Sequence, residues 1–179
     1  MKLSDGGILD RIDEGDIYIE DFDLERLNPN SYNLRLHNEL TVYENSINGE
    51  PLDMRKEMKT KTFKIDKKNG FLMEPNKLYL GRTREYTKTH NLVPGLEGRS
   101  SIGRLGIDIH ATAGFGDNGF EGYWTLELSC TEPVFLYPNI EICQIYYEPL
   151  MGPVLKTYDN GKYQKNKGIQ GSRIYREFE

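Results

Sequence analysis

The chain has 179 residues, of which 37% are hydrophobic and 28% are charged, and its formal net charge at pH 7 is −5. This length suits a single domain with a sizeable core. The acidic balance excludes a nucleic-acid coat or a membrane-surface protein, which need a basic face. No apolar run is as long as a secretory signal or a membrane span requires, so we expect a cytoplasmic protein.

The chain is predicted to begin with a helix and to continue almost entirely as strands. Ile8, Leu9 and Ile12 fall on one face of a short segment that ends near Gly15, and no other helix is predicted. After it, alternating or β-branched and aromatic runs are separated by turns rich in proline, glycine and asparagine. The predicted strands are 31–36, 39–44, 60–66, 77–83, 106–113, 123–130, 133–138 and 141–150. Strands at this spacing predict an antiparallel barrel or jelly roll.

The last part of the chain, residues 153–179, changes character. It is polar, contains several lysines, arginines and glycines, and lacks an alternating pattern. Two interpretations stay open from composition alone: a frayed basic tail, or a mobile flap that closes over a negatively charged ligand.

Two glycine-rich stretches resemble nucleotide-binding motifs that the chain does not satisfy. Residues 98–104 resemble a P-loop, but Arg104 and Leu105 stand where lysine and serine or threonine belong. Residues 114–119 match G-x-G-x-x-G, but a predicted strand follows, whereas a dinucleotide site needs a helix there. We interpret this second stretch as a hairpin turn.

No zinc site is expected. His37 and Glu39 match the first half of a zinc deaminase motif, but no C-x-x-C pair exists to supply the thiolates. Cys130 and Cys143 lie in apolar surroundings, so we expect buried thiols, with a disulfide or metal pair as the alternative.

Residues 98–106, GRSSIGRLG, are typical of an anion-binding turn. The guanidinium groups of Arg99 and Arg104 can each meet two phosphate oxygens, and Ser100 and Ser101 add hydroxyl donors. The glycines allow the backbone to approach the ligand closely. The alternative is a polar surface turn. In residues 123–130, alternation places Glu127 opposite its apolar neighbours, as a candidate general base or as a solvent-exposed carboxylate.

Residues 99–128 resemble the core signature of the dCTP deaminase family, within the trimeric dUTPase superfamily. Residues 27–36 are similar to the N-terminal box of that family, 143–145 to a later segment, and 162–173 to its C-terminal phosphate-closing segment. The resemblance implies a single domain over 1–179, folded as a distorted β jelly roll or barrel of the dUTPase-like type with a short N-terminal helix. Residues 153–179 would form the mobile flap, and homotrimers would place active sites at subunit interfaces.

The resemblance also implies the site residues. Glu127 would take a proton from the water that attacks cytosine C4, while Ser100 and Arg104 would orient that water and the glutamate. Mg²⁺ would be bound through the triphosphate and not by protein ligands, and dTTP would be a possible feedback inhibitor. The implied nucleotide-binding residues are Arg99, Ser100, Ser101, Ile102, Gly103, Arg104, Ala111, Ala113, Asp117, Phe120, Thr125, Leu126, Glu127, Gln144, Tyr158, Lys162 and Asn166.

The predicted product is dUMP. Residues 112–115 are more similar to the bifunctional members, which deaminate dCTP and then cleave the diphosphate, than to deaminases that release dUTP. Residues 116–122 lack the second acid and the tyrosine of plain dUTPases. The alternatives are a monofunctional deaminase, a dUTPase or, more remotely, a non-catalytic nucleotide-binding regulator. The chain departs from the family pattern at Gly116, Asn118, Lys165 and Asn166.

Overall fold

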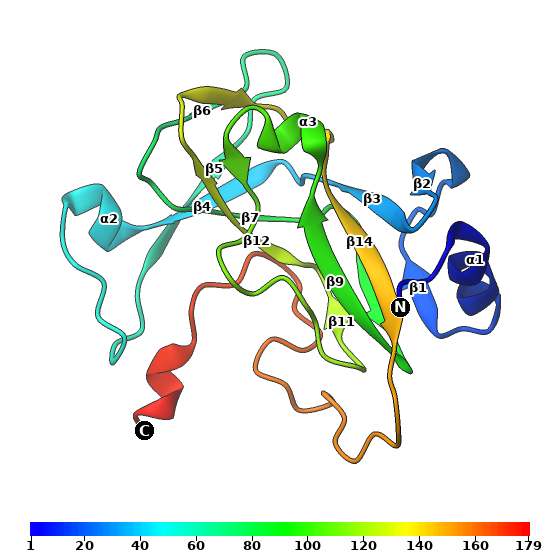
Figure 1. The fold of residues 1–179 in the computed structure, drawn as a ribbon. Coiled ribbons are helices and arrows are strands. Elements are labelled where there is room, and N and C mark those ends of the chain that lie inside the picture. Colours follow the sequence, from blue (N-terminus) through cyan, green and yellow to red (C-terminus); the bar gives the residue numbers. More distant parts are fainter.

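The computed structural model describes residues 1–179 and shows a mostly β fold whose strand pairs are antiparallel (Figure 1). One sheet has the order β2-β3-β14-β9, from Leu27–Asn28, Ser31–Arg35, Glu141–Pro149 and Leu92–Gly98. Another has the order β10-β12-β7-β4-β5, from Ile107–Asp108, Thr125–Cys130, Tyr79–Arg82, Glu39–Tyr43 and Thr60–Lys64. Two small sheets are β1-β8-β11, from Ile17–Ile19, Thr87–Thr89 and Glu121–Gly122, and β13-β6, from Val134–Leu136 and Phe71–Met73.

The predicted mostly-β class is confirmed, but one predicted strand is much shorter than expected, and the short strands β1, β2, β6, β8 and β11 were not predicted. Of the strand expected over 106–113, only β10 forms, although the Ile109 carbonyl still accepts the Glu127 amide of β12 at 2.9 Å. The sequence also failed to predict β9, which pairs with β14 along its whole length although Pro94 and Gly95 interrupt its pattern. Gly95 is required there, because a Cβ would meet the Tyr146 ring at 2.2 Å.

The N-terminal helix is confirmed as α1, Asp5–Asp13, whose amide at Gly7 donates to the capping hydroxyl of Ser4 and whose buried residue is Ile8. The expectation of no other helix was wrong. The additional helices are α2 at Glu44–Asn48, α3 at Ser100–Gly103 and the 3-10 turns η1 at Leu24–Arg26 and η2 at Ile174–Glu177. Each is about one turn long, too short to give a periodic apolar pattern. None of the helices is long and apolar enough to cross a membrane.

The core is continuous between the sheets and contains both cysteines. Tyr32 and Leu34 of β3, Leu126 and Leu128 of β12 and many other apolar side chains form one cluster of buried residues. Cys130 and Cys143 are buried and unpaired, as predicted, and burial raises the pKa of both thiols.

Strand β3 is also held by a buried ion cluster. The carboxylate of Glu85 accepts hydrogen bonds from Arg26 Nη1 at 2.7 Å and from Arg35 Nε at 2.6 Å. The Arg35 amide donates to the second carboxylate oxygen at 2.9 Å. A fully buried carboxylate that is paired in this way anchors its neighbours firmly, since removing one partner would leave a buried charge uncompensated.

Candidate functional site

The predicted anion-binding turn is built around α3. Arg99 precedes this one-turn helix, and its carbonyl accepts the amides of Ile102 and Gly103, both at 2.9 Å. The Ile102 side chain is buried in the core, whereas Ser100, Ser101 and Arg104 are exposed. The helix therefore presents hydroxyl and guanidinium donors to solvent from a backbone that the core holds in place. Such an arrangement can bind an anion.

Two residues of β14 contact the base of this turn. Arg99 donates from Nη1 to the Glu141 carbonyl and forms an ion pair through Nη2 with Glu141 Oε2, both at 2.9 Å. Gln144 donates from Nε2 to the Gly98 carbonyl at 3.1 Å. The predicted binding residues therefore lie close together, Gln144 on β14 and Arg99 directly after the adjacent strand β9.

Glu127 lies in the middle of β12, where burial alternates as the sequence predicted. Leu126 and Leu128 point into the core, so Leu126 can offer a ligand only its backbone. Glu127 is partly buried, and its Oε2 accepts the amide of Ala111 at 3.1 Å. This contact orients the carboxylate on a rigid strand and places it beside residues 111–113, which are exposed. A held, accessible carboxylate is suited to general base chemistry.

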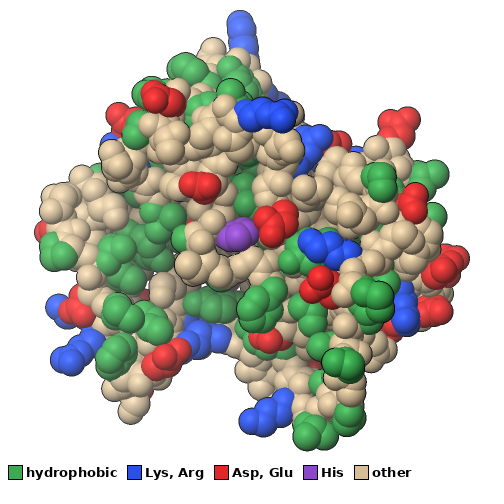
Figure 2. Space-filling view, viewed as in Figure 1, with side chains coloured by type: hydrophobic (Ala, Val, Ile, Leu, Met, Phe, Trp, Pro, Cys, Tyr) green, Lys and Arg blue, Asp and Glu red, His purple; other side chains and the backbone are tan.

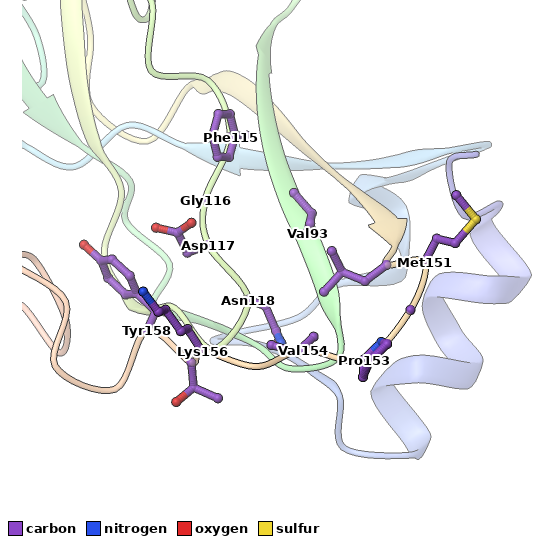
Figure 3. A pocket seen from close by; sticks show the side chains of 13 residues that line it. Val93, Phe115, Gly116, Asp117, Asn118, Met151, Pro153, Val154, Lys156 and Tyr158 are labelled. Carbon is purple, nitrogen blue, oxygen red and sulfur yellow. The ribbon is translucent and has the colours of Figure 1, made fainter.

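A separate pocket of about 480 Å³ contains Asp117 and Tyr158 (Figure 3). It lies between the start of β9, at Val93, the turn that carries Phe115, and the segment that follows β14. That segment exposes several apolar side chains, and Figure 2 shows hydrophobic side chains along the lower edge of this face. The pocket lining comprises Val93, Phe115, Gly116, Asp117, Asn118, Leu150, Met151, Gly152, Pro153, Val154, Lys156, Thr157 and Tyr158.

Residues 114–119 form a turn that leads into strand β11, which confirms the rejection of a dinucleotide motif. The Phe120 amide donates to the Asp117 carbonyl at 3.1 Å, and Gly119 adopts a φ of 90°. The Phe120 ring is only 8% exposed and packs against Trp124 at a centroid distance of 4.8 Å and against Tyr158 at 6.2 Å. Its contact with a sugar stays a prediction.

The structure explains one departure from the family pattern. A Cβ at residue 116 would meet the Trp124 ring at 2.4 Å and Pro94 at 3.1 Å. Gly116 is therefore required by the tryptophan, because the larger residue usual in the family has no room here. Asn118 keeps a structural role through its carbonyl, which accepts the Tyr158 amide at 3.3 Å.

The C-terminal segment folds onto the same hairpin of its own chain. Gln164 accepts the Glu121 amide at 2.9 Å and donates to the Gly119 carbonyl at 2.6 Å. Asn166 is buried and donates to the Tyr123 carbonyl at 3.0 Å, while Lys162 pairs with Glu177. Figure 1 shows this segment, orange to red, leaving the end of β14 and turning back toward β11 and β12. Tyr158 lines the pocket, whereas Lys162 and Asn166 do not, and the contact of all three with phosphate stays a prediction.

Within one chain the predicted site residues form separate groups. Val93, at the start of β9, lines the pocket, whereas Arg99 follows the other end of that strand. Six residues of extended chain span about 20 Å, at about 3.3 Å per residue. No hydrogen bond or ion pair joins Asp117 or Glu127 to the Arg99–Arg104 turn.

The sequence missed two residues that the structure ties to the turn. Glu141 and Asn33 link Arg99 to β3 through an ion pair and a side-chain hydrogen bond. No local pattern could reveal this, since the partners are far apart in the chain. No group of three or more histidine, cysteine, aspartate or glutamate residues is arranged to hold a metal ion.

Comparison with known proteins agrees with this arrangement. Residues 2–150 match the family described as dCTP deaminase-like. The chain is 58% identical over 179 residues to "dCTP deaminase, dUMP-forming" of Hathewaya histolytica, covering 100% of both chains. It is 56% identical to the protein of the same name from Cytophaga hutchinsonii, covering 100% of this chain and 99% of the other.

A solved structure supports the fold. The 2'-deoxycytidine 5'-triphosphate deaminase from Agrobacterium tumefaciens superposes with a TM-score of 0.61 at 20% sequence identity. The match covers 82% of this chain and 48% of that one. With the fold, the anion-binding turn and the held glutamate in place, and with a full-length match to these relatives, this chain belongs to the dCTP deaminase-like family.

Proposed function

We propose that this protein deaminates dCTP and cleaves the product to dUMP. The observation that carries the proposal is Glu127, a carboxylate fixed by the Ala111 amide on a rigid strand of a chain that is 58% identical to a dUMP-forming dCTP deaminase. The exposed serines and arginines of the α3 turn supply the donors that a triphosphate requires.

The chemistry balances with one water for each step. Glu127 takes a proton from water, whose oxygen bonds to C4 of cytosine, and the C4–amino bond then breaks. One proton of that water leaves on the ammonia, and the other ends on N3 of the uracil ring. Ser100 and Arg104 orient the water and the carboxylate. A second water then attacks the α-phosphate of dUTP, and dUMP and pyrophosphate separate. The substrate is the Mg²⁺ complex of the nucleotide, in which the ion neutralises phosphate charge and needs no protein ligand.

The proposed nucleotide contacts come from the α3 turn, the C-terminal segment, Asp117 and the backbone near Glu127. Arg99, Ser100 and Ser101 bind the triphosphate, with Tyr158 and Lys162 added from the C-terminal segment. Asp117 accepts a hydrogen bond from the sugar 3′-hydroxyl. Backbone groups at residues 111, 113 and 125–127 read the edge of the base, and the hydrogen bond from the Ala111 amide to Glu127 supports this by joining these two segments.

The separation of the site residues within one chain supports a site shared between copies. Val93, which lines the pocket with Asp117, and Arg99 lie about 20 Å apart along the extended backbone. We therefore propose a homotrimer in which one subunit supplies the turn and its neighbour supplies Glu127 and the pocket. We also propose that the enzyme acts in the cytoplasm and that dTTP inhibits it by occupying the same site.

The deciding experiment incubates the protein with dCTP and Mg²⁺ and separates the products by ion-exchange chromatography. Ammonia together with dUMP is expected. Ammonia with dUTP would indicate a monofunctional deaminase. Pyrophosphate from added dUTP with no reaction of dCTP would indicate a dUTPase. Tight dCTP binding without turnover would indicate a regulator, and addition of dTTP to the same assay tests the proposed inhibition.

A further inference from the structure

A ring of hydrogen bonds, closed by one ion pair, lies beneath the phosphate-binding turn. We define the polar ring as Gly98, Arg99, Asn28, Ser31, Asn33, Glu141 and Gln144. It begins at the Gly98 carbonyl, which accepts from Gln144 Nε2 at 3.1 Å, and Gln144 Oε1 in turn accepts from Ser31 Oγ at 2.8 Å. The ring therefore starts at the residue directly before Arg99.

The polar ring returns to Arg99 by a different route. Asn28 Nδ2 donates to Asn33 Oδ1 at 2.9 Å and lies 3.4 Å from Ser31 Oγ. Asn33 Nδ2 donates to Glu141 Oε2 at 3.0 Å, and that same oxygen pairs with Arg99 Nη2. The ring thus crosses the whole sheet β2-β3-β14-β9 and closes on adjacent residues of β9 and its extension.

The residues of the polar ring on β3 are buried, whereas those at the turn are partly exposed to solvent. Ser31 is 4% and Asn33 is 6% exposed, whereas the side chains of Arg99 and Glu141 are 33% and 31% exposed. Buried polar groups that are fully hydrogen-bonded order one another. Arg99 donates one hydrogen bond, to the Glu141 carbonyl, and pairs with the Glu141 carboxylate, while its other N–H donors have no hydrogen-bond partner in the chain.

The charge of Glu141 has a cost for the proposed function. A carboxylate beside a phosphate-binding arginine weakens the attraction of that site for a polyanion. Its benefit must then be geometric: the carboxylate fixes the guanidinium, so that the free donors already face the ligand. We infer that Glu141, supported by Asn33, is a positioning residue that orders Arg99 for triphosphate binding. This inference rests on the proposed function only in taking Arg99 as a phosphate ligand.

The test is a double-mutant cycle read by calorimetric titration of the whole protein with inorganic triphosphate and Mg²⁺. Glu141→Ala is expected to weaken binding about tenfold, as for loss of a charge-assisted hydrogen bond. Glu141→Gln keeps the acceptor oxygen and is expected to stay within about threefold of wild type. Combining Glu141→Ala with Arg99→Ala should bind no more weakly than Arg99→Ala alone.

Tyr79→Phe is the matched control, because it removes a buried hydroxyl that accepts the Glu74 amide in the other sheet and should leave triphosphate binding unchanged. Additive effects of the two alanines would overturn the inference, as would unchanged or tighter binding by Glu141→Ala or no binding by the wild type. With dCTP, Glu141→Ala should raise KM and leave kcat nearly unchanged. Lack of ammonia release by the wild type would refute the proposed function alone, since the triphosphate titration needs no turnover.

Discussion

The sheet that carries the anion-binding turn and the segment that follows Tyr158 are held in opposite ways. The first is bound by four paired strands, by the polar ring and by side chains in the core. The second is bound to residues 119–125 by two hydrogen bonds of the Gln164 side chain and by one each from the Lys165 amide, the Asn166 side chain and the Gln170 amide. Beyond residue 149, Asn166 alone is classed as buried.

This contrast indicates that the two regions have different roles, the sheet as a fixed support and the C-terminal segment as a part that can open. A segment with few buried apolar contacts can open at a small fraction of the free energy of global unfolding, whereas paired core strands cannot. If the proposed function is correct, the donors for the phosphates are arranged in advance, and the groups after residue 157 leave and return with each turnover.

The largest effect is expected for Glu127→Gln, which leaves both regions intact and removes only the proton acceptor. Ammonia release from dCTP should fall by about 10²–10⁴-fold, as for loss of a general base, while dCTP binding changes little. A coupled ammonia assay and calorimetry check this. Glu132→Gln makes the same charge change at an exposed site and should retain activity. Retained turnover in Glu127→Gln would remove this residue from the mechanism.

Ending the chain at Thr157 tests directly whether the C-terminal segment is needed for catalysis but not for folding. The truncated protein should keep its β-sheet circular dichroism, because the buried core lies almost entirely before residue 150. Its kcat/KM for dCTP should fall by about 100-fold, as the closing groups are lost. Unfolding of the truncated protein would show that the segment is part of the stable core.

Gln164→Ala should produce a smaller version of the same loss. It removes two hydrogen bonds to the 119–121 backbone, each contributing about 1 kcal/mol, so we expect KM for dCTP to rise several-fold. Limited proteolysis should cut the C-terminal segment faster. Lys167→Ala, at an exposed neighbouring position, is the matched control. Equal cleavage rates in the two variants would show that the hydrogen bonds of Gln164 do not hold the C-terminal segment in place.

The smallest effect concerns pH and the stable region alone. Burial lowers the pKa of His37, at the start of β4, and the nearby Arg82 lowers it further. The unfolded chain therefore binds a proton more readily than the folded one as the pH falls through about 6.5, and stability decreases there. His37→Asn should reduce the loss of thermal stability between pH 7.5 and 5.5. An unchanged pH profile would show that other groups control acid stability.

Much of the fold could be predicted from the sequence because burial alternates along its strands. Residues 125–130 show one buried side chain at every second position, and this is the pattern from which β12 was predicted. Strand β9 was not predicted, because Pro94 and Gly95 break that alternation. The strand forms nevertheless, because it pairs with β14. Helix α3 was not predicted, because a single helical turn is too short to show a periodic pattern of apolar residues.

The site could be predicted only in its local parts. Arg99, Ser100 and Ser101 are neighbours in the chain, so their shared chemistry was visible before any fold was known. The link from Arg99 to Glu141 joins residues that are 42 positions apart and depends on strand pairing. The space beside Gly116 is likewise limited by the ring of Trp124, eight positions further on. The sequence of the turn alone cannot reveal this contact.

Trp124, the single tryptophan, gives this enzyme an internal optical probe. Its indole is 7% exposed, donates to Thr87 and touches Phe120, which in turn contacts Tyr158 at the beginning of the closing segment. Movement of that segment would change the environment of the indole. Emission intensity in a stopped-flow instrument could then follow each cycle of nucleotide capture in real time, with no dye attached to the protein.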